Sequence, residues 1–438
     1  MGIPNFKFSA FAKASADKQF SILGHSISLK QVVKHPLFSG SAVMIIGSNF
    51  GNFLAYLYHV VMGRILGPGP YGELASFIAI IGLFSVTFSF LGTVIVKFVS
   101  SANEDERNAL YSFFLKKGVT VGISIGFVLL IISLPISQFL HLDIKTALLI
   151  GPTLAFFFFS LLFRSFLHGL MKFTKVVILA NFDLIFRFIF GLAFVYLGYS
   201  AFGASFGIFL GAFASLVLGA FFIKGALKYN KNEVFQDGKR IFKYSLPVLI
   251  YSVASNSFLS ADLLLAKHYF SPHTAGIYAS LSTLGKIIFY GAAPVSGVMF
   301  PLIAQRHAKG NSYKKILLMS IFITLIIAAI INTVYYFYPE LMVTILYGQK
   351  FIEAAPYLVW FGLFIGVFTL VNLFASYYLS VEKTKIVFWM PIFAGLQIAG
   401  IIIKHDTILD LIQVSLVSVS LFLVGLLIYY IYENKISK

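Results

Sequence analysis

The amino-acid sequence predicts an all-α polytopic membrane protein with twelve transmembrane helices arranged as two six-helix lobes. Three observations carry this prediction: an apolar composition, a series of separated apolar segments, and an internal repeat. Of the 438 residues, 59% are hydrophobic and only 11% are charged, and the mean hydropathy is +0.91. A soluble domain does not need so many apolar residues, whereas runs of about 18 or more of them are long enough to cross a bilayer.

The apolar segments are separated by short polar stretches. They cover residues 41–63, 73–96, 117–138, 146–169, 174–197 and 202–223, then 244–266, 275–302, 316–338, 355–379, 386–403 and 409–432. The fifth and sixth are separated by only a few residues around Tyr199, which predicts a tight hairpin. The predicted organisation is a leader (1–40), an N-terminal lobe (41–223), a basic linker (224–243), a C-terminal lobe (244–432) and a tail (433–438).

The stretch from Ile46 to Ser76 returns at an offset of 204 residues, close to half the chain length. It contains an apolar helix, the turn Leu-Gly-Pro-Gly-Pro-Tyr-Gly at 66–72, and the start of the next helix. Two similar halves in the same order are a known plan of secondary transporters. Seven of 31 positions match: Ile46 with Ile250, Ser48 with Ser252, Asn52 with Asn256, Pro68 with Pro272, Gly72 with Gly276, Ala75 with Ala279 and Ser76 with Ser280.

The distribution of Lys and Arg predicts the orientation. With the N-terminus inside, the inside segments, which include 164–175 with Arg164, hold 26 of the 33 cations, and the outside loops hold five. Cytoplasmic loops of membrane proteins carry such an excess. We therefore expect a multi-pass protein of the cytoplasmic (inner) membrane with both termini cytoplasmic. The net charge of +17 is then explained by contact with anionic membrane lipid rather than nucleic acid.

Several classes of function are disfavoured by what the sequence lacks. There is no cysteine, no Walker-type phosphate-binding motif and no metal-spaced histidine cluster. The predicted outside loops are too short for a catalytic domain. We therefore expect no catalytic residue, no metal, no cofactor and no enzymatic activity.

Ionisable side chains inside the predicted helices are the first candidates for a functional site, because such groups are costly in a bilayer. Lys286 lies near the middle of the eighth helix with no acid one turn away, so it is the main candidate for binding an anionic substrate. Asp183 and Arg187 are four residues apart, which favours either a self-neutralised pair or a cation in a cavity with a local counter-ion. Asp262 is a candidate for pairing with Lys286 or Lys267, or for holding a coupling ion.

Amides and one arginine complete the candidate set. Asn49, Asn52 and Asn256 lie in the first and seventh helices, where hydrogen bonds between helices are the simpler explanation. Asn52 and Asn256 occupy equivalent repeat positions, so they are expected to meet across the interface between the halves. Arg64 at the outer end of the first helix is expected to anchor at the membrane interface or to lie on a cavity rim.

Three stretches together resemble the polysaccharide transporter (oligosaccharide flippase) family of the multidrug/oligosaccharidyl-lipid/polysaccharide (MOP) exporter superfamily. They are Arg64-Ile-Leu-Gly-Pro-Gly-Pro-Tyr-Gly72, Tyr244-Ser-Leu-Pro-Val-Leu-Ile250 with Asn256 and Asp262 followed by Ala275-Gly-Ile-Tyr-Ala279, and Leu346-Tyr-Gly-Gln-Lys-Phe-Ile-Glu-Ala-Ala-Pro356. The resemblance extends over residues 40 to 432. It implies a central cavity lined by helices one, two, seven and eight, and alternating access.

The substrate that this resemblance implies is a polyprenyl-diphosphate-linked oligosaccharide, moved between leaflets for polysaccharide biosynthesis. In this hypothesis Lys286, helped by Arg64 or Arg187, holds the diphosphate, and Asn52 and Asn256 meet sugar hydroxyls. One alternative is a cation-coupled multidrug antiporter of the same superfamily, in which Asp262 or Asp183 carries H⁺ or Na⁺. Others are a flippase for a peptidoglycan precursor, a membrane glycosyltransferase and a non-catalytic membrane component of a polysaccharide-synthesis complex.

Overall fold

In the computed structural model of the chain, the described residues are 19–22, 25–28, 36–229, 249–250, 252–381, 383 and 388–436. Much of the predicted leader (1–40) and linker (224–243), and the end of the tail (433–438), lies outside the described residues. Within the leader, β1 (Gln19–Ile22) and β2 (His25–Ser28) form an antiparallel hairpin. The remaining regular structure is helical.

The N-terminal half forms one lobe of helices. It consists of α3 (Pro36–Leu66), α4 (Pro68–Ser101), α5 (Glu104–Ile131), α6 (Ser133–Leu140), α7 (Ile144–Gly169), α8 (Phe173–Phe194), the π-helical turn η1 (Val195–Tyr199) and α9 (Ser200–Lys224). The predicted hairpin around Tyr199 is present. The chain turns within η1 at Gly198, which has a positive φ of 90° that glycine adopts easily.

The C-terminal half forms the second lobe. Residues 252–258 are helical. They are followed by α11 (Ala261–Tyr269), α12 (Pro272–Ala308), α13 (Lys314–Phe337), α14 (Pro339–Tyr347), the 3₁₀ helix η2 (Gln349–Tyr357), α15 (Leu358–Ser380), α16 (Trp389–Ile403) and α17 (Ile408–Ile436). Each of the predicted apolar segments therefore coincides with helical structure in the part of the chain described.

Seven helical stretches among the described residues are long and apolar enough to cross a membrane. One of them, Phe173–Lys224, contains both α8 and α9. Large apolar side chains also remain exposed on the outer helices. On α5, for example, Ile123, Phe127 and Ile131 are each about 60% exposed and lie one helical turn apart on one face. Such a stripe fits contact with lipid, and the chain is a multi-pass membrane protein.

The turn between α3 and α4 follows from its sequence. Gly67 has a φ of +75°, which L side chains rarely adopt, and Pro68 then begins α4 at a position where a proline costs no hydrogen bond. The repeat-related helix α12 begins in the same way at Pro272, after Ser271, whose side chain accepts a hydrogen bond from the backbone of Thr274. Both halves therefore start their second long helix with a rigid proline turn.

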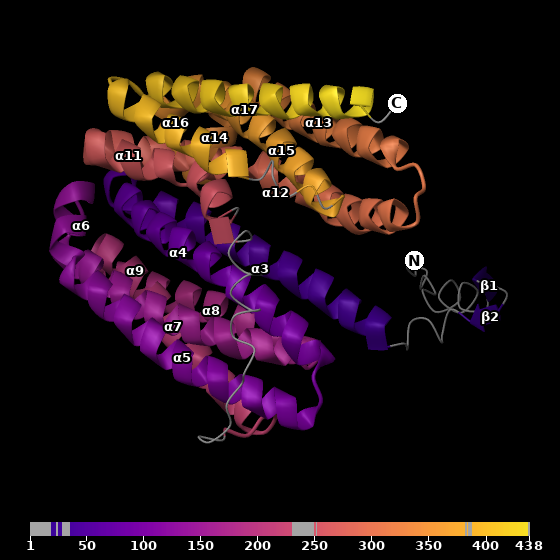
Figure 1. Cartoon of the computed structure of the whole chain (residues 1–438). Coiled ribbons are helices and arrows are strands. Elements are labelled where there is room, and N and C mark those ends of the chain that lie inside the picture. Colours follow the sequence, from indigo (N-terminus) through magenta and orange to yellow (C-terminus); the bar gives the residue numbers. More distant parts are fainter. Residues whose placement is uncertain are drawn as a thin grey trace, which may run out of the picture.

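The two lobes meet at one end and diverge toward the other (Figure 1). We call the end that contains the α3–α4 turn, α6, α11 and α14 the closed end, and the opposite end the open end. At the closed end the repeat-related glycines Gly72 of α4 and Gly276 of α12 touch. A Cβ atom on Gly72 would lie 2.8 Å from the backbone nitrogen of Gly276, and one on Gly276 would overlap the carbonyl oxygen of Pro68. The absence of side chains at these two positions lets the two backbones come into contact.

Candidate functional site

A cavity of 580 Å³ lies between the lobes, and we call it the central cavity. Its walls come from α3, α4, the segment 252–260 with α11, and α12. These helices contain the sequence-predicted residues Asn49, Asn52 and Asn256, which line the cavity together with Lys286. The repeat-related amides Asn52 and Asn256 therefore face the same space from opposite lobes.

The central cavity is rich in hydrogen-bond donors. The hydroxyls of Tyr56 and Ser282 and the Nδ2 of Asn256 are buried and have no hydrogen-bond partner among the described residues. Buried polar groups usually find a partner in the protein, so three unpartnered ones lining one cavity need an explanation. A ligand that presents several oxygen acceptors would satisfy all three.

Lys286 is the cation of the central cavity. It is half-buried in the middle of α12, and its electrostatic partner is Asp262 of α11. The Asp262 carboxylate is fully buried and accepts a hydrogen bond of 2.8 Å from the hydroxyl of Tyr278. No ion pair between Lys286 and Asp262 is present in the described part of the chain, and Lys267 interacts electrostatically with Glu73 of the other lobe. The ammonium group of Lys286 is thus not held by a direct counter-ion.

Tyr71 of α4 lies next to the central cavity and forms hydrogen bonds with residues of both lobes. Its buried hydroxyl lies 3.1 Å from Nδ1 of His59 and 3.1 Å from Oγ1 of Thr283, both of which line the cavity. It also lies 2.9 Å from the hydroxyl of Tyr347 in the other lobe. One side chain therefore joins both lobes beside the central cavity.

Two further bonds between the lobes are related by the repeat. Arg64 of α3 donates to the carbonyl oxygens of Leu346 at 3.0 Å and of Thr344 and Ile345, at the end of α14. Residue 268, which is 204 positions later, is a histidine whose Nδ1 lies 2.6 Å from the carbonyl oxygen of Phe139, at the end of α6. Each side chain reaches the last turn of a short helix in the opposite lobe, where free carbonyls attract donors. Arg64 lines neither this cavity nor the one described next.

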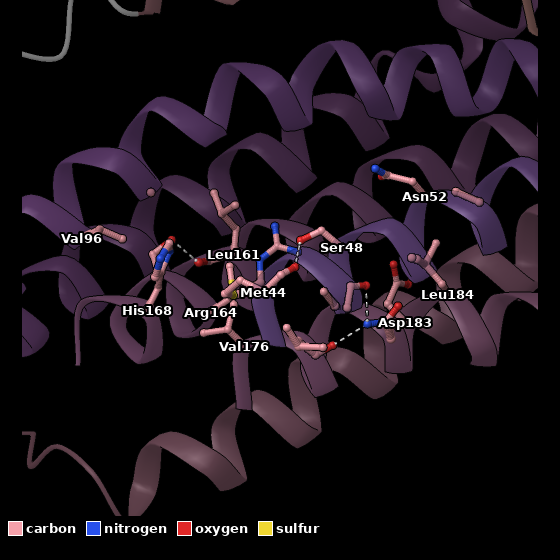
Figure 2. Close-up of a pocket in the computed structure, with 18 residues that line it drawn as sticks. Met44, Ser48, Asn52, Val96, Leu161, Arg164, His168, Val176, Asp183 and Leu184 are labelled. Atoms are coloured by element: carbon pink, nitrogen blue, oxygen red, sulfur yellow. Dashed lines mark hydrogen bonds between the residues drawn. The ribbon is translucent and has the colours of Figure 1, made fainter. Parts of the chain in front are cut away.

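A second cavity of 670 Å³ lies within the N-terminal lobe, and we call it the N-lobe cavity. It is lined by parts of α3, α4, α7 and α8, and it contains Asp183 (Figure 2). Asp183 forms an ion pair of 2.8 Å with Arg187, whose guanidinium also lies 5.7 Å from the centre of the Phe157 ring. The two side chains that the sequence places on one helix face are therefore paired with each other, away from Lys286 and its cavity.

Arg164 is a functional candidate that the sequence analysis missed. It was assigned to a cytoplasmic segment at 164–175, but α7 continues to Gly169 and carries Arg164 into the N-lobe cavity. Figure 2 shows its guanidinium between His168 and Asp183. No hydrogen bond or ion pair to Arg164 occurs in the described part of the chain. Hydropathy alone did not find it because it lies close to the end of an apolar run.

The fold is thus that of a polytopic membrane protein with a polar cavity between two helical lobes (Figure 1). A family model described as "Polysaccharide biosynthesis protein" matches residues 37–307. The chain belongs to this polysaccharide biosynthesis protein family. No protein with curated annotation matches the chain.

Solved structures with this fold are similar over most of the chain. An inward-facing multidrug resistance MATE family transporter of the MOP superfamily superposes with a TM-score of 0.73 at 12% identity, covering 87% of this chain and 96% of that one. The lipid II flippase MurJ in an inward closed conformation gives 0.71 at 16% identity, covering 89% and 87%. A MOP superfamily transporter from Pyrococcus furiosus gives 0.57 at 13% identity, covering 91% and 97%. These likenesses establish the fold.

Proposed function

We propose that the protein is a flippase that moves a polyprenyl-diphosphate-linked oligosaccharide across the cytoplasmic membrane by alternating access. The observation that carries the proposal is the chemistry of the central cavity. Lys286 supplies a positive charge there, and the unpartnered donors of Tyr56, Asn256 and Ser282 surround the same space. A diphosphate offers two negative charges and many oxygen acceptors, which this arrangement suits.

The low polarity of the surroundings strengthens this attraction. A charge pair in a partly desolvated site interacts several times more strongly than in water. Tyr278 donates to the Oδ2 of Asp262, and no ion pair joins Asp262 to Lys286 in the part of the chain described, so Lys286 remains available to a second anion. Asn52, on the opposite wall, is exposed to the cavity and is in position to meet a sugar hydroxyl next to the diphosphate.

The proposed transport cycle uses the two ends of the lobe interface. Twelve membrane-crossing helices with both termini in the cytoplasm place the closed end outside and the open end inside, as the Lys and Arg distribution favours. The headgroup then reaches the cavity from the inner leaflet, and rocking of the lobes opens the closed end to release it outside. Membrane lipid is the medium in which the polyprenyl chain stays during this movement.

The state of the acids supports a flippase over a cation-coupled antiporter. Asp183 is paired through its Oδ2 with Arg187 at 2.8 Å, and the Oδ2 of Asp262 accepts a hydrogen bond from Tyr278. A cationic drug entering the central cavity would also meet Lys286. H⁺ or Na⁺ remains a candidate driving ion, with Asp183 and Asp262 as its candidate carriers.

The test is translocation of a fluorescent polyprenyl-diphosphate oligosaccharide between the leaflets of liposomes that contain the purified protein. We expect transport by the natural chain and a loss of at least about ten-fold in the rate for Lys286→Gln, which removes a charge-assisted contact to the diphosphate. The matched control is Lys314→Gln, which removes an exposed cation at the start of α13. Efflux of cationic dyes driven by Na⁺ or H⁺, without lipid translocation, would instead identify an antiporter.

A further inference from the structure

We propose that the N-lobe cavity is a glycan subsite that selects an anionic sugar, with Arg164 binding the negative group of that sugar. The charge resides on a carboxylate, as in a uronic acid, or on a phosphate substituent of the sugar. The inference rests on the proposed function, because it assigns the part of the same substrate that lies beyond its diphosphate. It adds a selectivity for one chemical class of glycan that the central cavity does not provide.

The charge balance of the N-lobe cavity points to an anion. Arg164 and Arg187 share the single carboxylate of Asp183, which forms its 2.8 Å ion pair with Arg187, so one positive charge is left in excess. Arg164 is half-buried on α7, and its guanidinium projects into the cavity (Figure 2). A planar guanidinium binds a carboxylate or a phosphate through two parallel hydrogen bonds.

An unpartnered acceptor in the same cavity points to a ligand that carries hydroxyl groups. The Oδ1 atoms of Asn181 and Asp183 are buried without a hydrogen-bond partner among the described residues, and both residues are 8% exposed. The orientation of the Asn181 amide is fixed, because its Nδ2 donates to the carbonyl oxygens of Gly47 and Val177. The Oδ1 of Asp183 faces Gly211 of α9, where an added Cβ would lie 2.8 Å from it, whereas the Oδ1 of Asn181 lies next to Gly51, which lines the cavity. The Asn181 acceptor therefore awaits a donor, and sugar hydroxyls are donors. An inorganic anion or an ordinary phospholipid phosphate would satisfy Arg164 but not this acceptor.

The two cavities adjoin, which allows one ligand to occupy both. Asn52 and Ala55 of α3 line the central cavity and the N-lobe cavity. A substrate with its diphosphate at Lys286 can therefore extend its sugars past Asn52 toward Asp183 and Arg164. The volume of 670 Å³ is within the usual range of small-molecule pockets, about 300–1,000 Å³.

The test compares matched synthetic probes that differ only in the sugar. Four farnesyl-diphosphoryl disaccharides are used, ending in glucose, glucuronate, glucose 6-phosphate or methyl glucuronate, the last being the neutral ester. Their binding to the full chain in nanodiscs is measured for the natural protein and for Arg164→Gln, Arg164→Lys and Lys314→Gln. Farnesyl diphosphate without sugar reports the diphosphate site, with Lys286→Gln as its own variant.

We expect the natural protein to bind an anionic probe at least about ten-fold more tightly than glucose or the methyl ester. Preference for glucuronate would assign a carboxylate, and preference for glucose 6-phosphate a phosphate. Arg164→Gln should abolish this preference while leaving the binding of the glucose probe and of farnesyl diphosphate nearly unchanged. Arg164→Lys should retain part of the preference. Lys314→Gln should bind all probes like the natural chain.

Two results would overturn the inference. One is equal binding of charged and neutral probes by the natural protein, and the other is an equal loss for all probes in Arg164→Gln. If Arg164→Gln fails to fold, the comparison of charged and neutral probes with the natural protein and with Arg164→Lys still tests the inference. Failure of the proposed function has a different signature, because Lys286→Gln would then leave farnesyl diphosphate binding unchanged whatever Arg164 does.

Discussion

The two ends of the lobe interface are built in different ways. At the closed end, Gly72 and Gly276 bring two backbones into contact, and Tyr71 and Arg64 form hydrogen bonds between the lobes. Toward the open end the lobes diverge (Figure 1). Arg164 in the N-lobe cavity forms no hydrogen bond or ion pair with the described residues. The closed end thus resembles a protein interior, whereas the polar groups beyond it are left for a ligand.

The repeat explains why the closed end can also open. Arg64 and His268 are equivalent positions, and each donates to the last turn of a short helix in the opposite lobe. Tyr71 has no such counterpart, since the equivalent residue is Ala275. The closed end therefore has two features that follow the repeat, namely the backbone contact of Gly72 with Gly276 and the hydrogen bonds of Arg64 and His268. The hydroxyl cluster around Tyr71 does not follow the repeat. Such a junction is made of few contacts, and each of them is testable.

The largest effect on closure of the lobes is expected from a substitution that fills the contact between Gly72 and Gly276. In Gly276→Leu the new side chain overlaps Pro68, and overpacking costs about 1–3 kcal/mol, enough to shift a two-state equilibrium by about ten- to hundred-fold. The chain contains no cysteine, so Ser282→Cys in the central cavity provides a single thiol. We expect this thiol to become reactive toward a membrane-impermeant reagent added outside.

The matched control for this prediction is Gly297→Leu on the same helix. A Cβ at Gly297 meets nothing within 4 Å, so this variant should label like the parent. If Gly276→Leu also stayed protected from the outside reagent, the glycine contact would not be what holds the lobes together.

A smaller effect is expected from removing the asymmetric hydroxyl. Tyr71→Phe keeps the buried ring but leaves Tyr347, Thr283 and His59 without their shared partner. An unsatisfied buried group costs about 1–3 kcal/mol, so outside labelling of the cavity thiol should rise by about ten-fold. The control is Tyr58→Phe, whose hydroxyl bonds the carbonyl of Ala204 at 2.9 Å within one lobe. Equal labelling in the two variants would show that Tyr71 stabilises the fold rather than the closed end.

Much of the fold could be predicted because membrane helices are specified locally. Apolar runs predicted the helices, the few residues around Tyr199 predicted the hairpin, and the repeat placed Asn52 and Asn256 in one cavity. What failed were the features that depend on distant partners. The carbonyls that Arg64 binds lie 280 to 282 residues away, and no local pattern indicates them.

The site was predictable only in part, for a related reason. Lys286 stood out because a charge in the middle of an apolar helix violates the hydropathy pattern. Arg164 did not stand out, because a cation near a helix end also fits a loop, and only the course of α7 shows that it enters a cavity. Tyr71 appeared as one residue of a turn motif, although its hydroxyl joins both lobes.

The smallest effect on closure of the lobes is expected from removing the repeat-related hydrogen bonds of Arg64 and His268. Arg64 is exposed, and exposed charged contacts are usually worth about 0.2–1 kcal/mol. We therefore expect Arg64→Gln and His268→Gln each to raise outside labelling of the cavity thiol by a few-fold, and the double variant to show the product of the two increases, because the bonds lie on different helices.

Lys404→Gln is the control for these two variants, because it removes an exposed charged contact that lies within a single lobe. Lys404 contacts Asp410 of the same lobe at 2.8 Å. Because this pair does not join the lobes, its loss should leave labelling unchanged. If outside labelling rose no more in Arg64→Gln than in Lys404→Gln, the bond from Arg64 to α14 would not hold the closed end shut. The glycine contact and Tyr71 would then be the contacts that keep the closed end closed.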